Sequence, residues 1–252
     1  MSIHINLELT DHCNLKCKMC SQSLRDLAHG QPMTFMNFET WKHGIQGLED
    51  MEEELSISPH WLGEPTLHPE FDKFIRYAFE QNHNNKLFRE FKLHTNAVIF
   101  PNDRSNLILE LANSHSQFPN TFRFVHFSID AYSRDVYLSV KGGDRRNQVY
   151  DNITRFLKRR YEQNVAFPKI ALGFVVQPEN HAEARSFLEY WKYQLELFDC
   201  PVHLCSDWPD REMDSIYFRP LNTKHQEQAN RLHQETVQRL GIPYKKRSAN
   251  SF

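Results

Sequence analysis

The sequence predicts an α/β fold built on a parallel sheet, and three observations support this prediction. Short apolar segments of strand length alternate with longer amphipathic segments of helix length. No internal repeat, low-complexity run or linker divides the sequence. Polar residues follow directly after successive predicted strands, which is where parallel α/β folds place their ligand sites.

Six strands and six helices are predicted in alternation. The first strand follows from the alternating apolar residues between Ile3 and Leu9. The predicted strands are residues 3–9, 54–59, 88–94, 122–129, 170–176 and 202–204. The predicted helices are residues 37–51, 69–81, 103–113, 147–162, 181–197 and 224–240. Apolar residues at i, i+3, i+4 spacing, from Phe71 to Phe79 and from Phe187 to Phe198, indicate core-facing helix sides. This order predicts either an open, doubly wound sheet or a partial barrel.

Three of the five cysteines, Cys13, Cys17 and Cys20, fall within eight residues after the first predicted strand. Their C-x3-C-x2-C spacing can wrap one metal centre. A structural zinc site usually has four protein ligands, as does the [4Fe–4S] cluster of an electron carrier. Three thiolates on a tight loop therefore leave one iron open to a small molecule. His12 or a distant histidine completing a Cys3His zinc site is the alternative. The odd cysteine count argues against a disulfide scaffold.

The cysteine spacing resembles the cluster loop of the radical SAM superfamily, in which S-adenosylmethionine (SAM) binds the fourth iron through its amino and carboxylate groups. The turn at Gly63 and Glu64 resembles the family's second signature, which contacts the SAM amino group, with Leu62 in place of its first glycine. Glycine lets the backbone approach a ligand, and a carboxylate pairs with an ammonium group.

Three further segments resemble the subgroup related to SPASM-domain enzymes. Residues 94–97 resemble the Thr-Asn-Gly that ends the third strand, with Ala97 in place of glycine. Ser128 matches the serine near the SAM ribose, and Lys141 stands where the family more often has an arginine facing the SAM carboxylate. The resemblance thus implies a [4Fe–4S] cluster on the three cysteines and SAM binding by Gly63, Glu64, Asn96, Ser128 and Lys141. It assigns no catalytic residue.

The resemblance implies a partial (β/α)6 TIM-like barrel over residues 1–205, with a C-terminal loop and helix, residues 206–252, packing on it. SPASM enzymes carry a further domain of auxiliary clusters, for which we expect no room here. Cys200 and Cys205 are then interpreted as buried structural residues, or alternatively as partial cluster ligands or redox thiols. One cluster is the expected total.

The implied activity is reductive cleavage of SAM to a 5′-deoxyadenosyl radical, which takes a hydrogen atom from a substrate. We expect a small polar molecule, such as a sugar, an aminoglycoside or a nucleoside-like compound. An epimerase with Cys205 as hydrogen donor, a peptide-modifying enzyme, and a non-catalytic iron–sulfur or zinc protein are the alternatives. The residues considered for the substrate pocket are His94, His126, Asp130, Trp208, Asp210 and Arg211.

The charge balance and the hydropathy limit the partners. Lysine and arginine number 30 against 32 aspartate and glutamate, a formal charge of −2, which gives no general case for binding nucleic acid or membrane. No stretch is apolar enough to span a membrane, and the N-terminus has no signal-peptide pattern. We therefore expect a soluble, cytoplasmic enzyme that receives its electron from an external one-electron reductant such as flavodoxin or ferredoxin.

Overall fold

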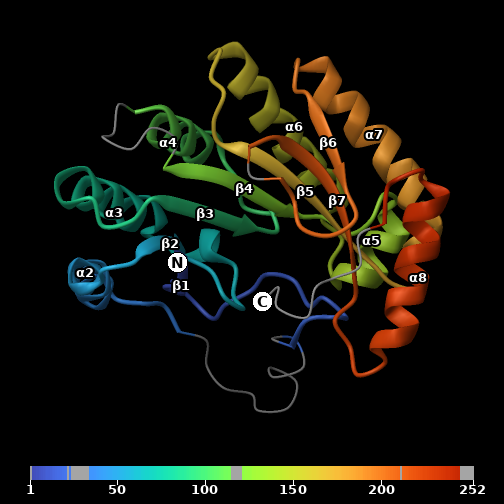
Figure 1. Cartoon of the computed structure of the whole chain (residues 1–252), viewed down its shortest axis with the longest axis horizontal. Helices are drawn as coiled ribbons and strands as arrows, with labels where there is room; N and C mark the ends of the chain where they lie inside the picture. Colours follow the sequence, from blue (N-terminus) through green and yellow to red (C-terminus); the bar gives the residue numbers. More distant parts are fainter. Residues whose placement is uncertain (1, 22, 24–33, 115–120, 211, 245–252) are drawn as a thin grey trace.

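One parallel sheet of seven strands organises the computed structural model, which describes residues 2–21, 23, 34–114, 121–210 and 212–244 (Figure 1). Its strands lie in the order β1-β2-β3-β4-β5-β7-β6, and every neighbouring pair is parallel. The strands are β1 (Ser2–Asn6), β2 (Glu54–Ser58), β3 (Glu90–Thr95), β4 (Phe122–Ser128), β5 (Lys169–Val176), β6 (Val202–Cys205) and β7 (Asp214–Pro220). The predicted α/β class and partial barrel are confirmed.

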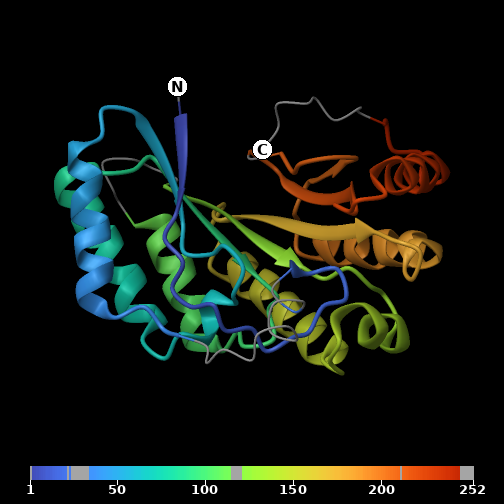
Figure 2. The ribbon, with the colours of Figure 1, turned by 90° about the horizontal axis from the view of Figure 1, so that it is seen from below.

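Helices line the convex side of this curved sheet and leave its concave side open (Figures 1 and 2). The α-helices are α2 (Phe38–Gln46), α3 (Phe71–Asn85), α4 (Asn102–Asn113), α5 (Arg134–Lys141), α6 (Arg146–Glu162), α7 (Ala184–Leu197) and α8 (Gln226–Arg239). Short 3-10 turns cover Gly47–Asp50, Pro65–Leu67 and His181–Glu183. None of the helices described here combines the length and apolar character needed to cross a membrane.

The predicted apolar helix sides face the core. In α3 the residues from Phe71 to Phe79 at helical spacing are buried, and Phe79 packs against Phe91 of β3 and Phe122 of β4 at ring distances of 5.2 and 5.6 Å. In α7 the corresponding residues, including Phe187 and Trp191, are also buried. Burial of these aromatic side chains supplies much of the hydrophobic stabilisation.

Strand β7 and helix α5 were not predicted from the sequence. Residues 214–220 begin with an aspartate and end with a proline, so only a short apolar run, Ile216 to Phe218, marks the strand. Helix α5 is eight residues long and carries charged residues, but its ends have the expected signals. Ser133 caps its first turn by accepting a hydrogen bond from Val136 N, and Gly142 ends it with a left-handed φ of 69°.

The expectation of only a loop and a helix after residue 205 was therefore wrong in one respect, since β7 joins the sheet between β5 and β6. Other elements differ at their ends. The predicted helix 37–51 is α2 followed by a 3-10 turn from Gly47, and the predicted strand 3–9 ends at Asn6. Beyond Asn6 the chain still forms a backbone hydrogen bond with β2, in which Leu7 N donates to Ser58 O at 2.8 Å.

A buried ion pair fixes the start of β7. Arg160 of α6 donates from Nη1 and Nη2 to the two carboxylate oxygens of Asp214, both at 2.7 Å, and the two side chains are 5% and 4% exposed. Asp214 also accepts a hydrogen bond from Ile170 N of β5 at 2.8 Å, and Arg160 reaches Cys200 Sγ at 2.9 Å. A bidentate pair of this kind is strong and geometrically specific. It ties β7 to β5, α6 and the turn before β6.

We expect Asp214→Ala to lower the free energy of unfolding by about 3–5 kcal/mol, because it leaves the buried guanidinium of Arg160 without its carboxylate. Urea unfolding followed by circular dichroism measures this loss. Glu110→Ala is the matched control, since Glu110 pairs with Arg76 on the exposed surface, and it should cost about 1 kcal/mol or less. Equal losses in the two variants would contradict the anchoring role of the buried pair.

Candidate active site

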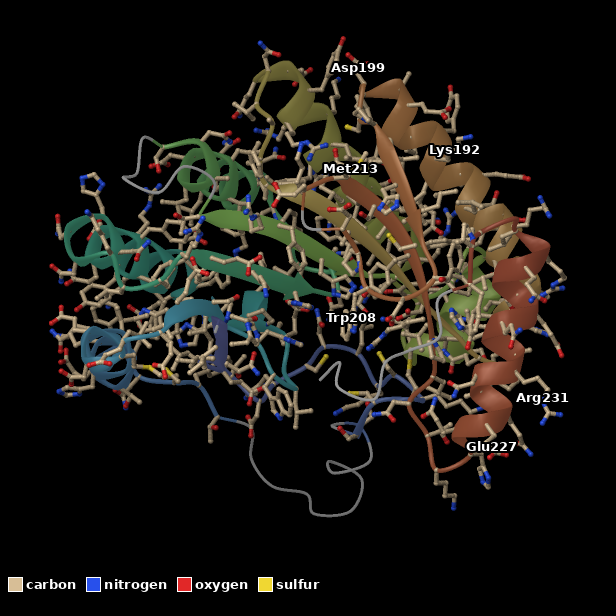
Figure 3. The ribbon with its side chains drawn as sticks, viewed as in Figure 1. Lys192, Asp199, Trp208, Met213, Glu227 and Arg231 are labelled. Carbon is tan, nitrogen blue, oxygen red and sulfur yellow. The ribbon has the colours of Figure 1, made fainter. Side chains whose placement is uncertain are left out.

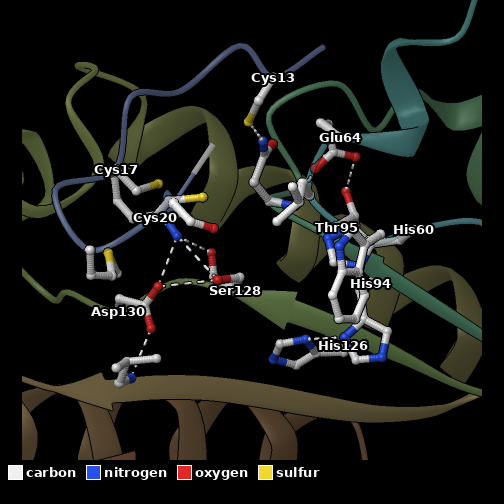
Figure 4. Close-up of a pocket in the computed structure, with 18 of the residues that line it drawn as sticks. Cys13, Cys17, Cys20, His60, Glu64, His94, Thr95, His126, Ser128 and Asp130 are labelled. Carbon is white, nitrogen blue, oxygen red and sulfur yellow. Dashed lines mark hydrogen bonds and ion pairs between the residues drawn. The ribbon is translucent and has the colours of Figure 1, made fainter. Parts of the chain in front are cut away.

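A cavity of about 320 Å³ lies at the C-terminal ends of the strands (Figure 4). Cys17, Cys20 and Asp130 lie on one side of it, and Glu64 and His94 on the other (Figure 4). This position is the one expected for a ligand site in a parallel α/β fold. The structure brings together every residue predicted to bind the cluster or SAM: Cys13, Cys17, Cys20, Gly63, Glu64, Asn96, Ser128 and Lys141.

The cysteine loop is held by the end of α5. Lys16 N donates to Lys141 O at 3.1 Å, and Lys18 N donates to Val140 O at 2.9 Å. At Gly142 a Cβ atom would lie 2.3 Å from Lys16 O, so only glycine allows this approach. The unpredicted helix therefore supports the predicted cluster loop.

The three thiols suit a group with several metal atoms. Among the described residues, no three histidine, cysteine or acidic side chains converge on a position for one metal ion, although the three cysteines line one cavity. Burial raises the pKa of Cys13 to about 12 and raises the pKa of Cys17, so these thiolates require a positive partner. The His12 ring stacks on Phe35 at 4.4 Å. A metal centre bound by the three cysteines would supply the positive charge that their thiolates require.

The turn after β2 packs directly on the cysteine loop. Glu64 N donates to His12 O at 2.6 Å, and Glu8 Oε1 accepts hydrogen bonds from Leu62 N and Gly63 N at 2.6 and 2.8 Å. A Cβ atom at position 63 would lie 1.9 Å from Thr10 O, which excludes any residue but glycine. Gly63 thus sets the distance between the turn and the loop.

The Glu64 carboxylate is 3% exposed and aligned by four donors. Its Oε1 accepts from Thr66 N, Thr66 Oγ1 and Thr95 Oγ1 at 3.1, 2.6 and 2.8 Å, and its Oε2 accepts from Asn96 N at 2.6 Å. Burial raises the pKa of Glu64, although these hydrogen bonds oppose the rise. A cation in the cavity would favour the charged form. The arrangement therefore suits an ammonium ligand.

Asn96 connects the third strand to the cysteine loop. Its Nδ2 donates to Asn14 Oδ1 at 2.7 Å and lies 3.8 Å from Cys13 Sγ. The next residue, Ala97, has a φ of 59°, in the left-handed region that favours glycine. This conformation explains why the resembling motif has glycine there, and Asn152 Nδ2 stabilises it by donating to Ala97 O at 2.8 Å.

Lys141 is already bound by neighbouring groups. Its Nζ donates to Asp130 Oδ2 at 2.8 Å and to Ser128 O and Oγ at 3.0 and 3.1 Å. Burial lowers the pKa of Lys141, but the Asp130 carboxylate outweighs it and raises the pKa overall. The ammonium group thus has an acceptor for each of its three hydrogens. The contact of Lys141 with the SAM carboxylate stays a prediction. It requires the hydrogen bonds of Lys141 to Asp130 and Ser128 to rearrange.

Histidines from β3 and β4 form the remaining wall. His94 Nδ1 and His126 Nδ1 are 2.8 Å apart, and Tyr217 OH hydrogen-bonds to His126 Nε2 at 2.5 Å. A Cβ atom at Gly173 would lie 2.6 Å from His126 Nε2, so Gly173 leaves room for this chain. Burial lowers the pKa of His126 to about 3 and that of His94 well below its ordinary value. Both rings are neutral at pH 7.

The substrate-pocket residues considered from the sequence are only partly brought together. His94, His126 and Asp130 line the cavity. Trp208 and Asp210 are not among its described lining residues, since Trp208 lies beside Arg219 and Asp210 lies beside His203 at 3.5 Å, and Arg211 lies outside the described residues. Sequence reasoning missed Arg219, which enters from the unpredicted strand β7. A prediction of β7 from its short apolar run would have pointed to the residue at its end.

Residues 7–190 match the Radical SAM superfamily, and the chain belongs to this superfamily. The family implies a [4Fe–4S] cluster and SAM as cofactors. The sequence is 22% identical over 187 residues to the tungsten-containing aldehyde ferredoxin oxidoreductase cofactor-modifying protein of Pyrococcus furiosus, covering 74% of this chain and 47% of that protein. It is 27% identical over 103 residues to the S-adenosylmethionine-dependent nucleotide dehydratase of Selenomonas ruminantium, covering 40% of this chain and 34% of that protein.

The structure of native anSMEcpe with bound AdoMet has the same fold. The match has a TM-score of 0.58 at 18% identity and covers 87% of this chain and 51% of that one. A second anSMEcpe structure, with bound AdoMet and the Cp18Cys peptide, matches with the same TM-score at 16% identity, over the same shares of the two chains. The chain thus spans about half the length of these relatives, or less.

The neutral histidines predict a pH dependence of stability. In the unfolded chain a histidine takes up a proton below about pH 6.5, whereas His126 in the folded protein does so only near pH 3. The unfolded state therefore binds more protons between these values, and the free energy of unfolding should fall as the pH is lowered from 6.5. Urea unfolding from pH 7 to pH 4 should show a smaller slope in His126→Gln. The exposed His43→Gln is the control, and an unchanged slope in His126→Gln would refute the prediction.

Proposed function

We propose that this chain removes a hydrogen atom from a small polar substrate, using an iron–sulfur cluster and SAM held side by side. The observation that carries the proposal is that the residues matching the two family signatures, far apart in sequence, line one cavity. The ligands proposed for the [4Fe–4S] cluster are Cys13, Cys17 and Cys20. The residues proposed to hold SAM are Gly63, Glu64, Asn96, Ser128 and Lys141.

When bound, the cluster and SAM supply a 5′-deoxyadenosyl radical by reductive cleavage of SAM. The protein binds and orients the two groups. Glu64 receives the SAM ammonium, with its carboxylate aligned by Thr66, Thr95 and the backbone of Asn96. Gly63 allows the chain to pass close to the cysteine loop. The wall of His94 and His126 adds no charge beside this site, because burial lowers the pKa values of both rings.

The substrate proposal rests on the polar side chains among the residues that line the cavity and on one relative. The Selenomonas ruminantium relative is named for acting on a nucleotide, which favours a nucleoside-like substrate over a sugar or an aminoglycoside. Epimerisation and peptide modification are the alternatives, and the anSMEcpe structure with bound peptide keeps the second open. Deuterium transferred to 5′-deoxyadenosine from a labelled nucleotide, and not from a labelled peptide, would support the nucleoside-like class.

The partners follow from the chemistry. The cluster requires an external one-electron reductant, such as flavodoxin or ferredoxin. Thiolate ligation of an iron–sulfur cluster at an open cavity requires a reducing compartment, which favours a cytoplasmic location. Cys200 contacts Arg160, and Cys205 packs near His203, so we assign both to structural roles. A formal charge of −2 gives no support to nucleic acid as a partner.

Anaerobic reconstitution should yield about four irons per chain. Replacing Cys13, Cys17 and Cys20 together by alanine should abolish iron binding, because the three thiolates are the proposed protein ligands. Colorimetric iron analysis and mass spectrometry of 5′-deoxyadenosine after reduction with dithionite measure the two outcomes. Cys200→Ser and Cys205→Ala are the matched controls and should keep both. Stoichiometric zinc, or iron retained in the triple variant, would overturn the proposal.

Glu64→Gln should weaken SAM binding by about 1–3 kcal/mol, the cost of losing a charged hydrogen bond. Equilibrium dialysis on reconstituted protein measures the affinity, and the iron content should stay at the wild-type value. The exposed Glu110→Gln serves as control and should leave the affinity unchanged. If Glu64→Gln binds SAM as tightly as wild type, Glu64 is not part of the SAM site.

A further inference from the structure

Arg219 is a cationic side chain in the cavity that no carboxylate contacts directly in the described part of the chain. It stands near the C-terminal end of β7, and its Nε is buried without a hydrogen-bond partner. Its guanidinium makes no ion pair or hydrogen bond with any residue in the described part of the chain. Buried donors are nearly always satisfied, so an unpaired guanidinium at a ligand cavity indicates a group that it binds.

The other charges around the cavity do not neutralise Arg219. Among the described lining residues, Lys141 is the second lysine or arginine, and its charge is paired with Asp130 at 2.8 Å. Glu64 is aligned on the opposite part of the sheet by donors from β3 and from its own turn. His94 and His126 are neutral because burial lowers their pKa values. Among the described lining residues, Arg219 is therefore the basic side chain that forms no ion pair.

Arg219 also lies away from the place proposed for the amino-acid end of SAM. Glu64 follows β2, and β7 is four positions further along the sheet, with strands about 4.8 Å apart. The ammonium and carboxylate of one amino acid are attached to the same carbon atom. A SAM molecule whose ammonium contacts Glu64 thus keeps its carboxylate near the cysteine loop. The charge of Arg219 acts instead on His126, Asp130 and Tyr217.

The surroundings of Arg219 suit an anionic group attached to an organic molecule. Its guanidinium carbon is 5.7 Å from the ring centre of Trp208, which is 45% exposed and labelled in Figure 3. Asn222, three residues after Arg219, also lines the cavity and supplies an amide. A guanidinium fork binds phosphate and carboxylate with paired hydrogen bonds.

We propose that Arg219, with Trp208 and Asn222 beside it, forms the substrate-anion subsite of this cavity, and that the substrate carries a phosphate or carboxylate group. The inference rests on the proposed function, because it assumes that this cavity also receives the substrate. It narrows the substrate class to anionic molecules and disfavours a cationic aminoglycoside.

Anion binding to reconstituted, SAM-loaded protein tests this subsite. The probes are inorganic pyrophosphate for phosphate and succinate for carboxylate, with chloride at equal ionic strength as the blank. Tryptophan fluorescence, with Trp208 as the neighbouring reporter, gives the affinity. Arg219→Gln should weaken binding of the preferred probe roughly 10-fold or more, and Arg219→Lys should weaken it less. Arg76→Gln, on the exposed surface, is the control and should have no effect.

A second measurement does not depend on the variants folding. In the wild-type protein the preferred anion should slow modification of Arg219 by phenylglyoxal, read by peptide mass spectrometry, and should not slow modification of Arg76. Protection by pyrophosphate alone assigns a phosphate-bearing substrate, and protection by succinate alone assigns a carboxylate.

Three results would overturn the subsite. They are the absence of binding by either probe, equal binding by Arg219→Gln, and a loss of SAM affinity in Arg219→Gln as large as that in Glu64→Gln. The third result would assign Arg219 to the cofactor. Failure of the proposed function is read separately, as absent iron or absent 5′-deoxyadenosine in wild-type protein.

Discussion

The close approach of three backbone segments determines the geometry of this site. The cysteine loop lies between the turn after β2 and the end of α5, and hydrogen bonds from backbone groups join it to both. Each contact passes at a glycine, Gly63 against Thr10 O and Gly142 against Lys16 O, where no side chain fits. Because these contacts involve main-chain atoms, they place the three cysteines relative to Glu64 independently of side-chain rotamers.

The electrostatic character of the cavity follows from this enclosure. Glu64, Asp130 and Lys141 are all buried, so their charges are retained only through specific partners. Asp130 and Lys141 satisfy one another, whereas Glu64 depends on neutral donors and on whatever cation enters the cavity. The cavity thus has an acidic group, Glu64, at one end and a basic group, Arg219, at the other, and the two are not paired with each other. Bound ligands can pair with each of them.

The sequence predicted those parts of the site that are coded locally. The spacing of Cys13, Cys17 and Cys20 and the Gly63-Glu64 turn can be read from a few neighbouring residues. Strand β7 could not be predicted in this way, because its burial comes from insertion between two other strands and its anchor, Asp214, pairs with Arg160 in α6. Arg219 was missed for the same reason. The positive φ of Ala97 was also hidden, since alanine carries no local signal for it.

The strand order has a consequence for the two ends of the cavity. The chain makes the edge strand β6 before β7, yet β6 reaches the sheet only through β7. Strand β6 is therefore held in the sheet through β7, and β7 is held through its pairing with β5. The β6–β7 pair, with its connecting segment, carries Arg219 and Trp208. The two ends of the cavity thus belong to different parts of the sheet, since Glu64 follows β2 and the proposed anion subsite lies on the β6–β7 pair towards the opposite edge.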